Sequence, residues 1–255
     1  MKNLRNEVFA ILEGMNVKVR CVDSVKNGVD KFGISFDIGK EMKPIFYVDD
    51  FESSDCNVIA SRMLSMLPNI NTEITNVNVK DKIADKKYIL DNIYIGIERV
   101  NEAKIIKRNT PFNGIQQYMY IVINDEMRTK VTSKFLDAVG IDELDAWFYA
   151  KCNTKENAYI NTPLPGMVII TNKNGVYGAA CALVNKAIRE VCRIYNTTRI
   201  VLIPSSIHEF ICLPFDESTD VESLKEMITS VNNDVVNAVD QLGNEPYIVD
   251  IDFGY

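Results

Sequence analysis

The sequence has few of the residues that most metal and catalytic sites require. It holds a single histidine, His208, and a single tryptophan in 255 residues. Six cysteines occur without a C-x-x-C pair, and one histidine does not complete a zinc site with them, so we expect no metal and no cofactor. Cys181, Cys192 and Cys212 lie in apolar segments, a setting typical of free buried thiols in a reducing compartment.

Long hydrophobic runs and an excess of positive charge are also missing. No window approaches the roughly 18 apolar residues of a transmembrane helix, and the first residues show no secretory apolar region. The net charge of −7 argues against nucleic acid or an anionic membrane as a partner, because both need a basic face. The basic runs at residues 85–87 and 104–108 are typical of solvated faces. We therefore expect a cytoplasmic protein that binds neither.

Helical and strand patterns alternate in the N-terminal part of the chain. Apolar spacing predicts a helix over residues 2–13, then a hairpin of two strands that turns at Asn27 and Gly28. A third strand begins after Pro44. A helix over residues 54–67 follows, and Pro68 is expected to end it.

The middle of the chain combines helices with one clear strand. A helix is predicted over residues 79–90, and the segment up to residue 109 fits helix or strand. Residues 117–125 are apolar on both faces and predict a central strand. A helical hairpin then turns at Gly140. Polar side chains are placed to cap its two helices, Thr132 or Ser133 on the first and Asp142 on the second.

The C-terminal part predicts a strand–helix–strand–strand–helix–strand order, which is the ferredoxin-like order. Its segments are residues 167–171, 179–196, 199–204, 209–214, 221–235 and 246–253. The proline-rich stretch at residues 162–166 is the strongest boundary signal. The fold class is therefore α+β, with an N-terminal lobe over residues 1–161 that contains a small antiparallel sheet and helices, and a C-terminal βαββαβ module over residues 162–255.

The segment "PSSIHE" carries the residue types of a hydrolytic triad. Ser205 or Ser206 is a candidate nucleophile, His208 a candidate base and Glu209 its orienting carboxylate. Neighbouring residues of an extended chain point to opposite faces, and no G-x-S-x-G elbow is present. A polar turn between two strands, stabilised by its own serines, is the alternative. If His208 takes part in chemistry, we expect its partners elsewhere in the module, with Asn172 and Tyr177 considered first.

The segment "TNKNGVYGAAC" is a candidate anion site, because a strand passes through a G-x-x-G turn into a helix start. Asn172, Gly175, Tyr177 and Gly178 are its candidate ligand-binding residues. The turn lacks the first glycine of G-x-G-x-x-G and a Walker lysine. A turn that only packs a strand on a helix, with Gly175 at positive φ, is the alternative.

Acidic and aromatic clusters complete the candidate sites. Carboxylates gather at residues 48–55, and Asp250 and Asp252 alternate on one strand as paired metal ligands sometimes do, although solvent-facing strand residues look the same. "AWFYA" places Trp147 beside Phe148 and Tyr149. Core packing is the expected role of these aromatic residues, and a binding anchor for a partner is the alternative.

The two polar turns are similar to motifs of a bacterial family of domains of unknown function, family 5688, found in low-GC Gram-positive gut bacteria. The shared motifs are T-N-x-x-x-x-x-G-A-A, on Thr171, Asn172, Gly178, Ala179 and Ala180, and P-S-S-x-H-E, on Pro204, Ser205, Ser206, His208 and Glu209. The resemblance runs over most of the chain but departs at its end, where "AVDQLGNEPYIVD" replaces a Glu-rich segment. It implies no activity. It implies that both turns belong to one module. If the order of that module is ferredoxin-like, we expect the strands that reach the two turns to be neighbours in a sheet.

Three functional hypotheses follow. The leading one is a binding or interaction protein without catalysis, whose partner is another protein or a small anionic ligand. The first alternative is a serine hydrolase that uses Ser205 or Ser206 with His208 and Glu209. The second is a regulator that binds an anion or nucleotide through the turn at residues 172–178.

Overall fold

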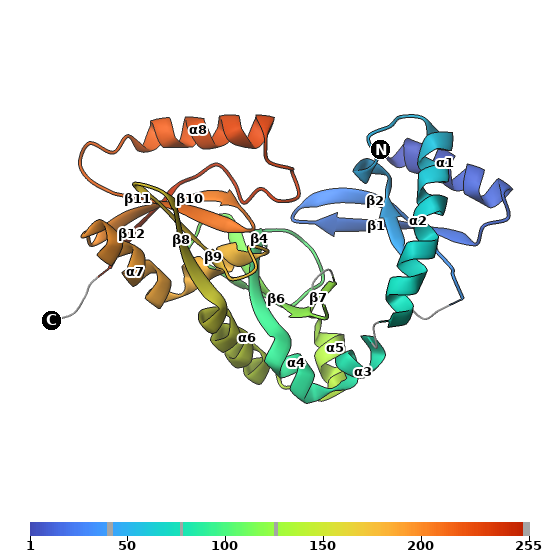
Figure 1. Cartoon of the computed structure of the whole chain (residues 1–255), viewed down its shortest axis with the longest axis horizontal. Coiled ribbons are helices and arrows are strands. Elements are labelled where there is room, and N and C mark those ends of the chain that lie inside the picture. Colours follow the sequence, from blue (N-terminus) through green and yellow to red (C-terminus); the bar gives the residue numbers. More distant parts are fainter. Residues whose placement is uncertain (40–42, 77–78, 125–126, 252–255) are drawn as a thin grey trace. The chain divides into compact units, whose positions relative to one another are not determined.

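The computed structural model describes residues 1–39, 43–76, 79–124 and 127–251 (Figure 1). The chain forms two compact units, unit 1 (Met1–Asp81) and unit 2 (Lys82–Tyr255). The boundary expected between residues 161 and 162 lies inside a paired strand of unit 2, so the compact units divide at a different place. Strands and helices are both present and all paired strands are antiparallel, which confirms the α+β class.

Unit 1 is a three-stranded antiparallel sheet, in the order β1-β2-β3, with two long helices. Its elements are α1 (Lys2–Gly14), β1 (Val19–Lys26), β2 (Val29–Phe36), β3 (Ile45–Tyr47), the 3-10 turn η1 (Val48–Asp50) and α2 (Cys56–Asn76); α3 (Val79–Ala84) spans the division between the units. Val8, Ile34, Phe36 and Met63 are central in its core.

Most predicted elements of unit 1 form, with one clear exception at Pro68. The hairpin turns at Asn27 and Gly28, both with positive φ, as expected for a two-residue turn. The helix predicted to end at Pro68 continues to Asn76. Proline removes one N–H from the helical ladder and disfavours helix at the preceding residue, but the buried stripe of Ile59 and Met63 already fixes the helix direction.

Unit 2 begins with a four-stranded antiparallel sheet. Its elements are α4 (Lys86–Asn92), β4 (Ile93–Arg99), β5 (Lys107–Asn109), β6 (Ile115–Val122), β7 (Arg128–Lys130), α5 (Ser133–Val139) and α6 (Glu143–Asn157). The predicted central strand is confirmed, since β6 pairs with β4, β5 and β7. The segment from residue 91 to residue 109, for which the sequence fits helix or strand, contains the strands β4 and β5. Asp85 divides the predicted helix over residues 79–90, because its carboxylate caps a new helix at α4.

The rest of unit 2 is built on a five-stranded sheet in the order β12-β10-β11-β9-β8. Its elements are β8 (Ala158–Leu164), β9 (Met167–Asn172), the 3-10 helix η2 (Gly178–Leu183), α7 (Asn185–Tyr195), β10 (Arg199–Ser206), β11 (Glu209–Pro214), α8 (Val221–Asp234) and β12 (Tyr247–Asp250). The βαββαβ order along the chain is confirmed from β9 to β12. The hairpin strands β10 and β11 lie at the centre of the sheet.

Helical segments cover both faces of this sheet, as Figure 1 shows for α7 and α8. Val201 and Ile203 of β10 face α8, whereas Ile200 and Leu202 belong to the larger core with α7, η2 and the four-stranded sheet. The alternation explains why β10 is hydrophobic at consecutive positions.

Two further predictions concern helix ends. Thr132 and Asp142 cap α5 and α6 as expected, and Gly140 adopts a left-handed conformation at the turn between them. The single helix predicted over residues 179–196 is wrong, because extended Val184 separates η2 from α7.

Among the described residues, no helix combines the length and apolar character needed to cross a membrane.

Candidate functional site

The two polar turns singled out in the sequence touch each other in unit 2. Thr171 Oγ1 donates to the carbonyl oxygen of His208 at 2.9 Å. The Tyr177 backbone N–H donates to His208 Nδ1 at 3.1 Å. The strand before the first turn, β9, pairs directly with β11, the strand after the second turn, and β11 separates it from β10. We call this contact between residues 171–179 and 205–209 the turn junction.

Asn172 uses its side chain to hold its own turn together. Its Oδ1 accepts from the backbone N–H groups of Asn174 and Val176, and its Nδ2 donates to the Val176 carbonyl. The other backbone N–H groups from residue 173 to residue 177 also donate within the chain. An anion needs free N–H donors, and within residues 173–177 this turn has none. Gly175 has positive φ as expected and faces open space.

Tyr177 and Gly178 carry the close packing of the junction. Tyr177 has φ +58°, an uncommon conformation for a residue with a side chain, and its ring lies 5.7 Å from the ring of His208. Gly178 is fully enclosed. A Cβ there would lie under 3.0 Å from Thr171 Oγ1 and from the backbone of Asn172 and His208. The family motif glycine is therefore a packing requirement.

The serine, histidine and glutamate side chains do not form a triad geometry. Ser205 Oγ donates to Glu209 Oε1 at 3.4 Å, and Ser206 Oγ accepts from the His208 backbone N–H at 3.1 Å. His208 Nε2 lies 3.7 Å from Asp240 Oδ1. Within the described chain, neither serine hydroxyl is bonded to the imidazole. The base–nucleophile contact of a hydrolase is therefore missing from this arrangement.

The sequence reasoning missed Asp240, which approaches from a distant segment. Its carbonyl accepts from the Ile207 N–H at 2.7 Å, so Asp240 also holds the backbone of the second turn. Because His208 Nδ1 accepts a hydrogen bond, the neutral imidazole carries its proton on Nε2, on the side of Asp240. Both ring nitrogens thus face groups that position the side chain.

Beside the junction lies a network of tyrosines and charges on the four-stranded sheet. Glu98 is buried, accepts from Gln116 Nε2 at 3.0 Å and pairs with Lys130. The Lys130 ammonium lies over the ring of Tyr118 at 4.3 Å. Burial raises the pKa of Tyr118 well above its usual value. No sequence motif indicates this network, and its cations already lie over the rings of its own tyrosines.

The acidic clusters are largely neutralised by lysine and arginine. Lys31 Nζ lies 2.7 Å from carboxylate oxygens of both Asp49 and Asp50. Asp250 pairs with Arg199 at 2.5 Å. Asp252 lies outside the described residues. In the described part of the chain, no three histidine, cysteine, aspartate or glutamate side chains converge as metal ligands.

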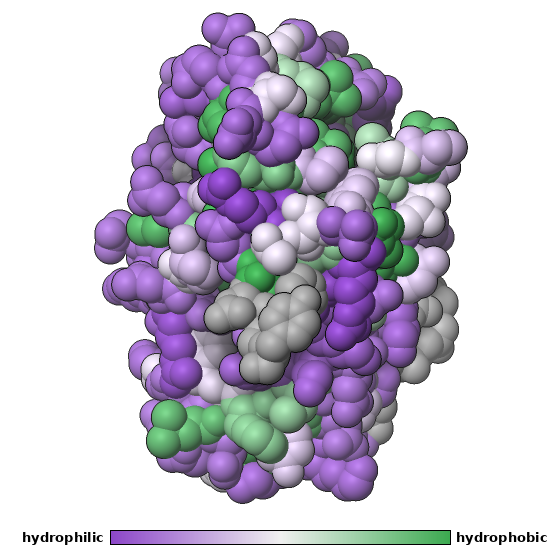
Figure 2. All heavy atoms as spheres, turned by 90° about the vertical axis from the view of Figure 1, so that its left-hand side faces the viewer, coloured by the Kyte–Doolittle hydropathy of each residue, from purple (hydrophilic) through white to green (hydrophobic). Residues whose placement is uncertain are grey.

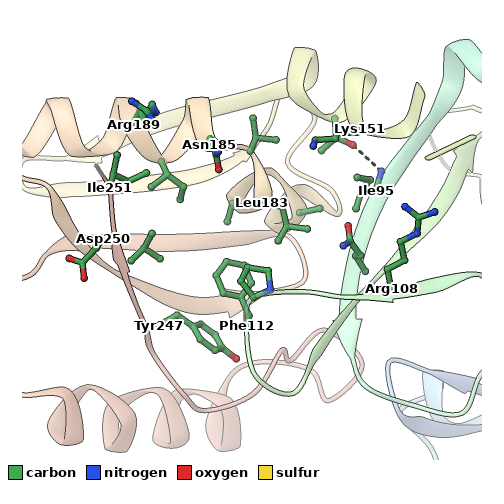
Figure 3. A pocket seen from close by; sticks show the side chains of 18 of the residues that line it. Ile95, Arg108, Phe112, Lys151, Leu183, Asn185, Arg189, Tyr247, Asp250 and Ile251 are labelled. Carbon is green, nitrogen blue, oxygen red and sulfur yellow. Dashed lines mark hydrogen bonds between the residues drawn. The ribbon is translucent and has the colours of Figure 1, made fainter. Parts of the chain in front are cut away.

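A cavity of about 860 Å³ opens in unit 2, between the four-stranded sheet with α6 and the edge strand β12 (Figure 3). Its apolar wall includes Phe112 from the loop before β6, and Leu183 at the end of η2. The ring of Phe112 lies tilted against that of Tyr247 of β12 with 4.9 Å between ring centroids, and the Tyr247 hydroxyl donates to the Asn113 carbonyl. Burial raises the pKa of Tyr247 to about 12, so this hydroxyl stays protonated at neutral pH.

The α6 side of the cavity is formed by Trp147, Lys151 and Thr154, one turn apart. Thr154 Oγ1 accepts from the Ile95 N–H of β4 at 2.9 Å, the hydrogen bond drawn in Figure 3. Trp147 is buried, as predicted, and its Nε1 has no hydrogen-bond partner among the described groups. A buried donor left unpaired costs about 1–3 kcal/mol. Phe148 and Tyr149, by contrast, are exposed, so core packing is wrong for them.

The sequence reasoning did not predict this cavity. Its residues come from seven separate helices and strands and from loops beside them, so no local motif records them. Arg108 was assigned to a solvated basic run, yet it lies at the cavity, with its guanidinium 4.4 Å from the Trp147 ring. Of the candidate residues, Trp147, as a binding anchor, and Asp250, as a metal ligand, lie at the cavity.

The model of a family of unknown function (DUF5688) matches residues 112–250, a little over half of the chain. Both polar motifs lie inside the match, as does most of the cavity wall. No curated protein and no solved structure matches the chain.

Proposed function

The chain belongs to the family of unknown function DUF5688, and we propose that it is a binding protein for a small molecule with a large apolar part, held in the cavity of unit 2. The cavity of about 860 Å³ carries this proposal. Ligand sites have volumes of roughly 300–1,000 Å³ and combine apolar walls with a few polar groups. Phe112, Trp147 and Leu183 supply such walls.

Binding is favoured over catalysis by the chemistry of both regions. At the turn junction, the imidazole of His208 is held by Tyr177 and Asp240 rather than by a serine. The described lining of the cavity contains no serine, cysteine or histidine, and Thr154 Oγ1 is bonded to backbone. These are the groups that act most often as nucleophile or base.

A small molecule is favoured over a protein partner by the distribution of exposed apolar side chains. On the face drawn in Figure 2, hydrophobic side chains form separate small groups among hydrophilic ones. Leu144 and Phe148 of α6 are among the most exposed apolar residues, one turn apart. Two such side chains fall short of the continuous apolar area that marks a stable protein interface.

The proposal has a wider setting. We infer that residues 1–111 belong to the same family architecture and that the protein acts in the cytoplasm of a low-GC Gram-positive bacterium. The support is the resemblance of the motifs at Thr171 and Pro204, together with six cysteines that are free thiols, as is typical of a reducing compartment.

The test uses N-phenyl-1-naphthylamine, a neutral dye that becomes fluorescent out of water. We expect saturable binding to the full chain with one site, weakened at least about tenfold by Leu183→Asp, because that carboxylate must lose water when the dye binds. Leu164→Asp is the matched control, since Leu164 is exposed on β8 and outside the cavity lining. Absence of saturable binding, or equal affinities for the two variants, contradicts the proposal.

A further inference from the structure

The charges around the cavity are arranged at its two ends. Figure 3 shows Arg108 and Lys151 on one side and Arg189 and Asp250 on the other, with Leu183 between them. Arg108 extends from β5 and Lys151 from α6, two elements that are distant in the sequence. One end is therefore lined by two cations, and the middle is apolar.

The two cations at this end have capacity for another partner. Arg108 pairs with Glu143 at 3.6 Å, and both side chains are more than two-fifths exposed, so this ion pair is weak. A guanidinium has five N–H donors, and that of Arg108 lies over the Trp147 ring. Lys151 is exposed and forms no ion pair within the described chain. Its ammonium group is therefore available to an anionic ligand.

The local charge contrasts with that of the whole protein. The chain carries a net charge of −7, whereas three cations and one carboxylate occur among the described lining residues. That carboxylate, Asp250, already pairs with Arg199. Positive charge beside an apolar wall, in an otherwise acidic protein, attracts a negatively charged group and leaves it close to low-dielectric surface.

We propose that the ligand of this cavity is an amphipathic anion. Its carboxylate, sulfonate or phosphate group lies between Arg108 and Lys151, and its apolar part lies along Leu183 and Phe112. This inference rests on the proposed function, since it names the chemical class of the molecule that the cavity binds. It also moves the anion site to the cavity from the turn at residues 172–178, where the N–H groups of residues 173–177 already donate within the chain.

The experiment compares two dyes with the same ring system, 1-anilinonaphthalene-8-sulfonate and its neutral analogue N-phenyl-1-naphthylamine. Both are titrated into the full chain and into Arg108→Gln, Lys151→Gln and the double variant. Lys155→Gln is the matched control, because Lys155 is an exposed lysine of α6 outside the cavity lining. Competition of the sulfonate dye by octanoate, octyl phosphate and octanol then separates carboxylate from phosphate chemistry.

We expect the sulfonate dye to bind more tightly than the neutral dye, and more weakly as salt rises. Each single variant should weaken the sulfonate dye roughly two- to fivefold and the double variant roughly tenfold, because each removes one partly exposed ion pair. The neutral dye and Lys155→Gln should show no change. If both dyes bind equally and the charge variants have no effect, the anionic class is overturned while the binding function stands. If neither dye binds, the proposed function fails and this inference fails with it.

Discussion

Replacing Gly178 by alanine tests whether the two family motifs form one rigid joint. The added Cβ would lie under 3.0 Å from Thr171 Oγ1, from the Asn172 backbone nitrogen and from the His208 carbonyl oxygen. Two of these three atoms are backbone, so no change of rotamer relieves them. Overpacking of this kind costs about 1–3 kcal/mol. Displacing Thr171 from His208 removes a hydrogen bond worth about 1 kcal/mol more.

We therefore expect Gly178→Ala to lower the free energy of unfolding of unit 2 by about 3 kcal/mol. The assay is urea unfolding followed by Trp147 fluorescence, because the only tryptophan is buried in unit 2. Gly175→Ala is the matched control. It lies in the same turn with φ +67° and nothing within 4 Å of an added Cβ, so only left-handed strain of about 1 kcal/mol applies.

A double-mutant cycle with Thr171→Ala sharpens the result. Removing the Thr171 hydroxyl eliminates one of the three close contacts, so Gly178→Ala should cost about 1 kcal/mol less in that background. The cost should persist in part, because the backbone atoms remain. If Gly178→Ala lowers the free energy of unfolding no more than Gly175→Ala does, the turn junction accommodates the added methyl group without strain, and the reasoning is refuted. If Gly178→Ala does not fold, Thr171→Val still reports the loss of the hydrogen bond, about 1 kcal/mol.

Three further outcomes follow from the geometry. A fluorophosphonate probe should label neither Ser205 nor Ser206, since neither hydroxyl contacts the imidazole; labelling lost in a serine-to-alanine variant would favour the hydrolase. Burial raises the pKa of Cys181 and Cys212 from 9.0 to about 12, so both thiols ionise first in the unfolded state. The free energy of unfolding should therefore be unaffected by these thiols below about pH 8, and each thiol should lower it by about 1.4 kcal/mol at pH 10. Urea titrations at the two pH values measure this loss, and the contribution of a thiol should be absent when that cysteine is replaced by alanine. Asp142→Ala should cost about 1 kcal/mol through its lost helix cap, read by urea unfolding, whereas an unchanged midpoint would show that the cap is dispensable.

Local sequence patterns predicted those features whose causes are local. The turn at Asn27 and Gly28, the caps Thr132 and Asp142 and the central strand β6 each depend on a few neighbouring residues, and all three were predicted correctly. Pro68 and Val184 show the limit of such patterns. A proline in a helix with a packed face does not end it, and the small residues of η2 pack on β9 as a separate 3-10 segment.

The site depended on contacts between distant segments, which spacing alone does not record. The motifs did point to two turns that meet, and His208 does contact Tyr177. Residue types could not show that the polar side chains of these turns form hydrogen bonds with backbone groups. Asp240 and the cavity between Arg108 and Leu183 come from separate parts of the chain, so only the folded arrangement brings them to notice.

The most direct measurement of the central claim is quenching of Trp147 emission by N-phenyl-1-naphthylamine. Trp147 is the only tryptophan and forms part of the cavity wall, so a dye bound there lies beside it. We expect saturable quenching at one dye per chain in the wild type and in Leu164→Asp, with affinity reduced at least about tenfold in Leu183→Asp. Quenching that never saturates, or that is the same in Leu183→Asp as in the wild type, would contradict a binding site in this cavity.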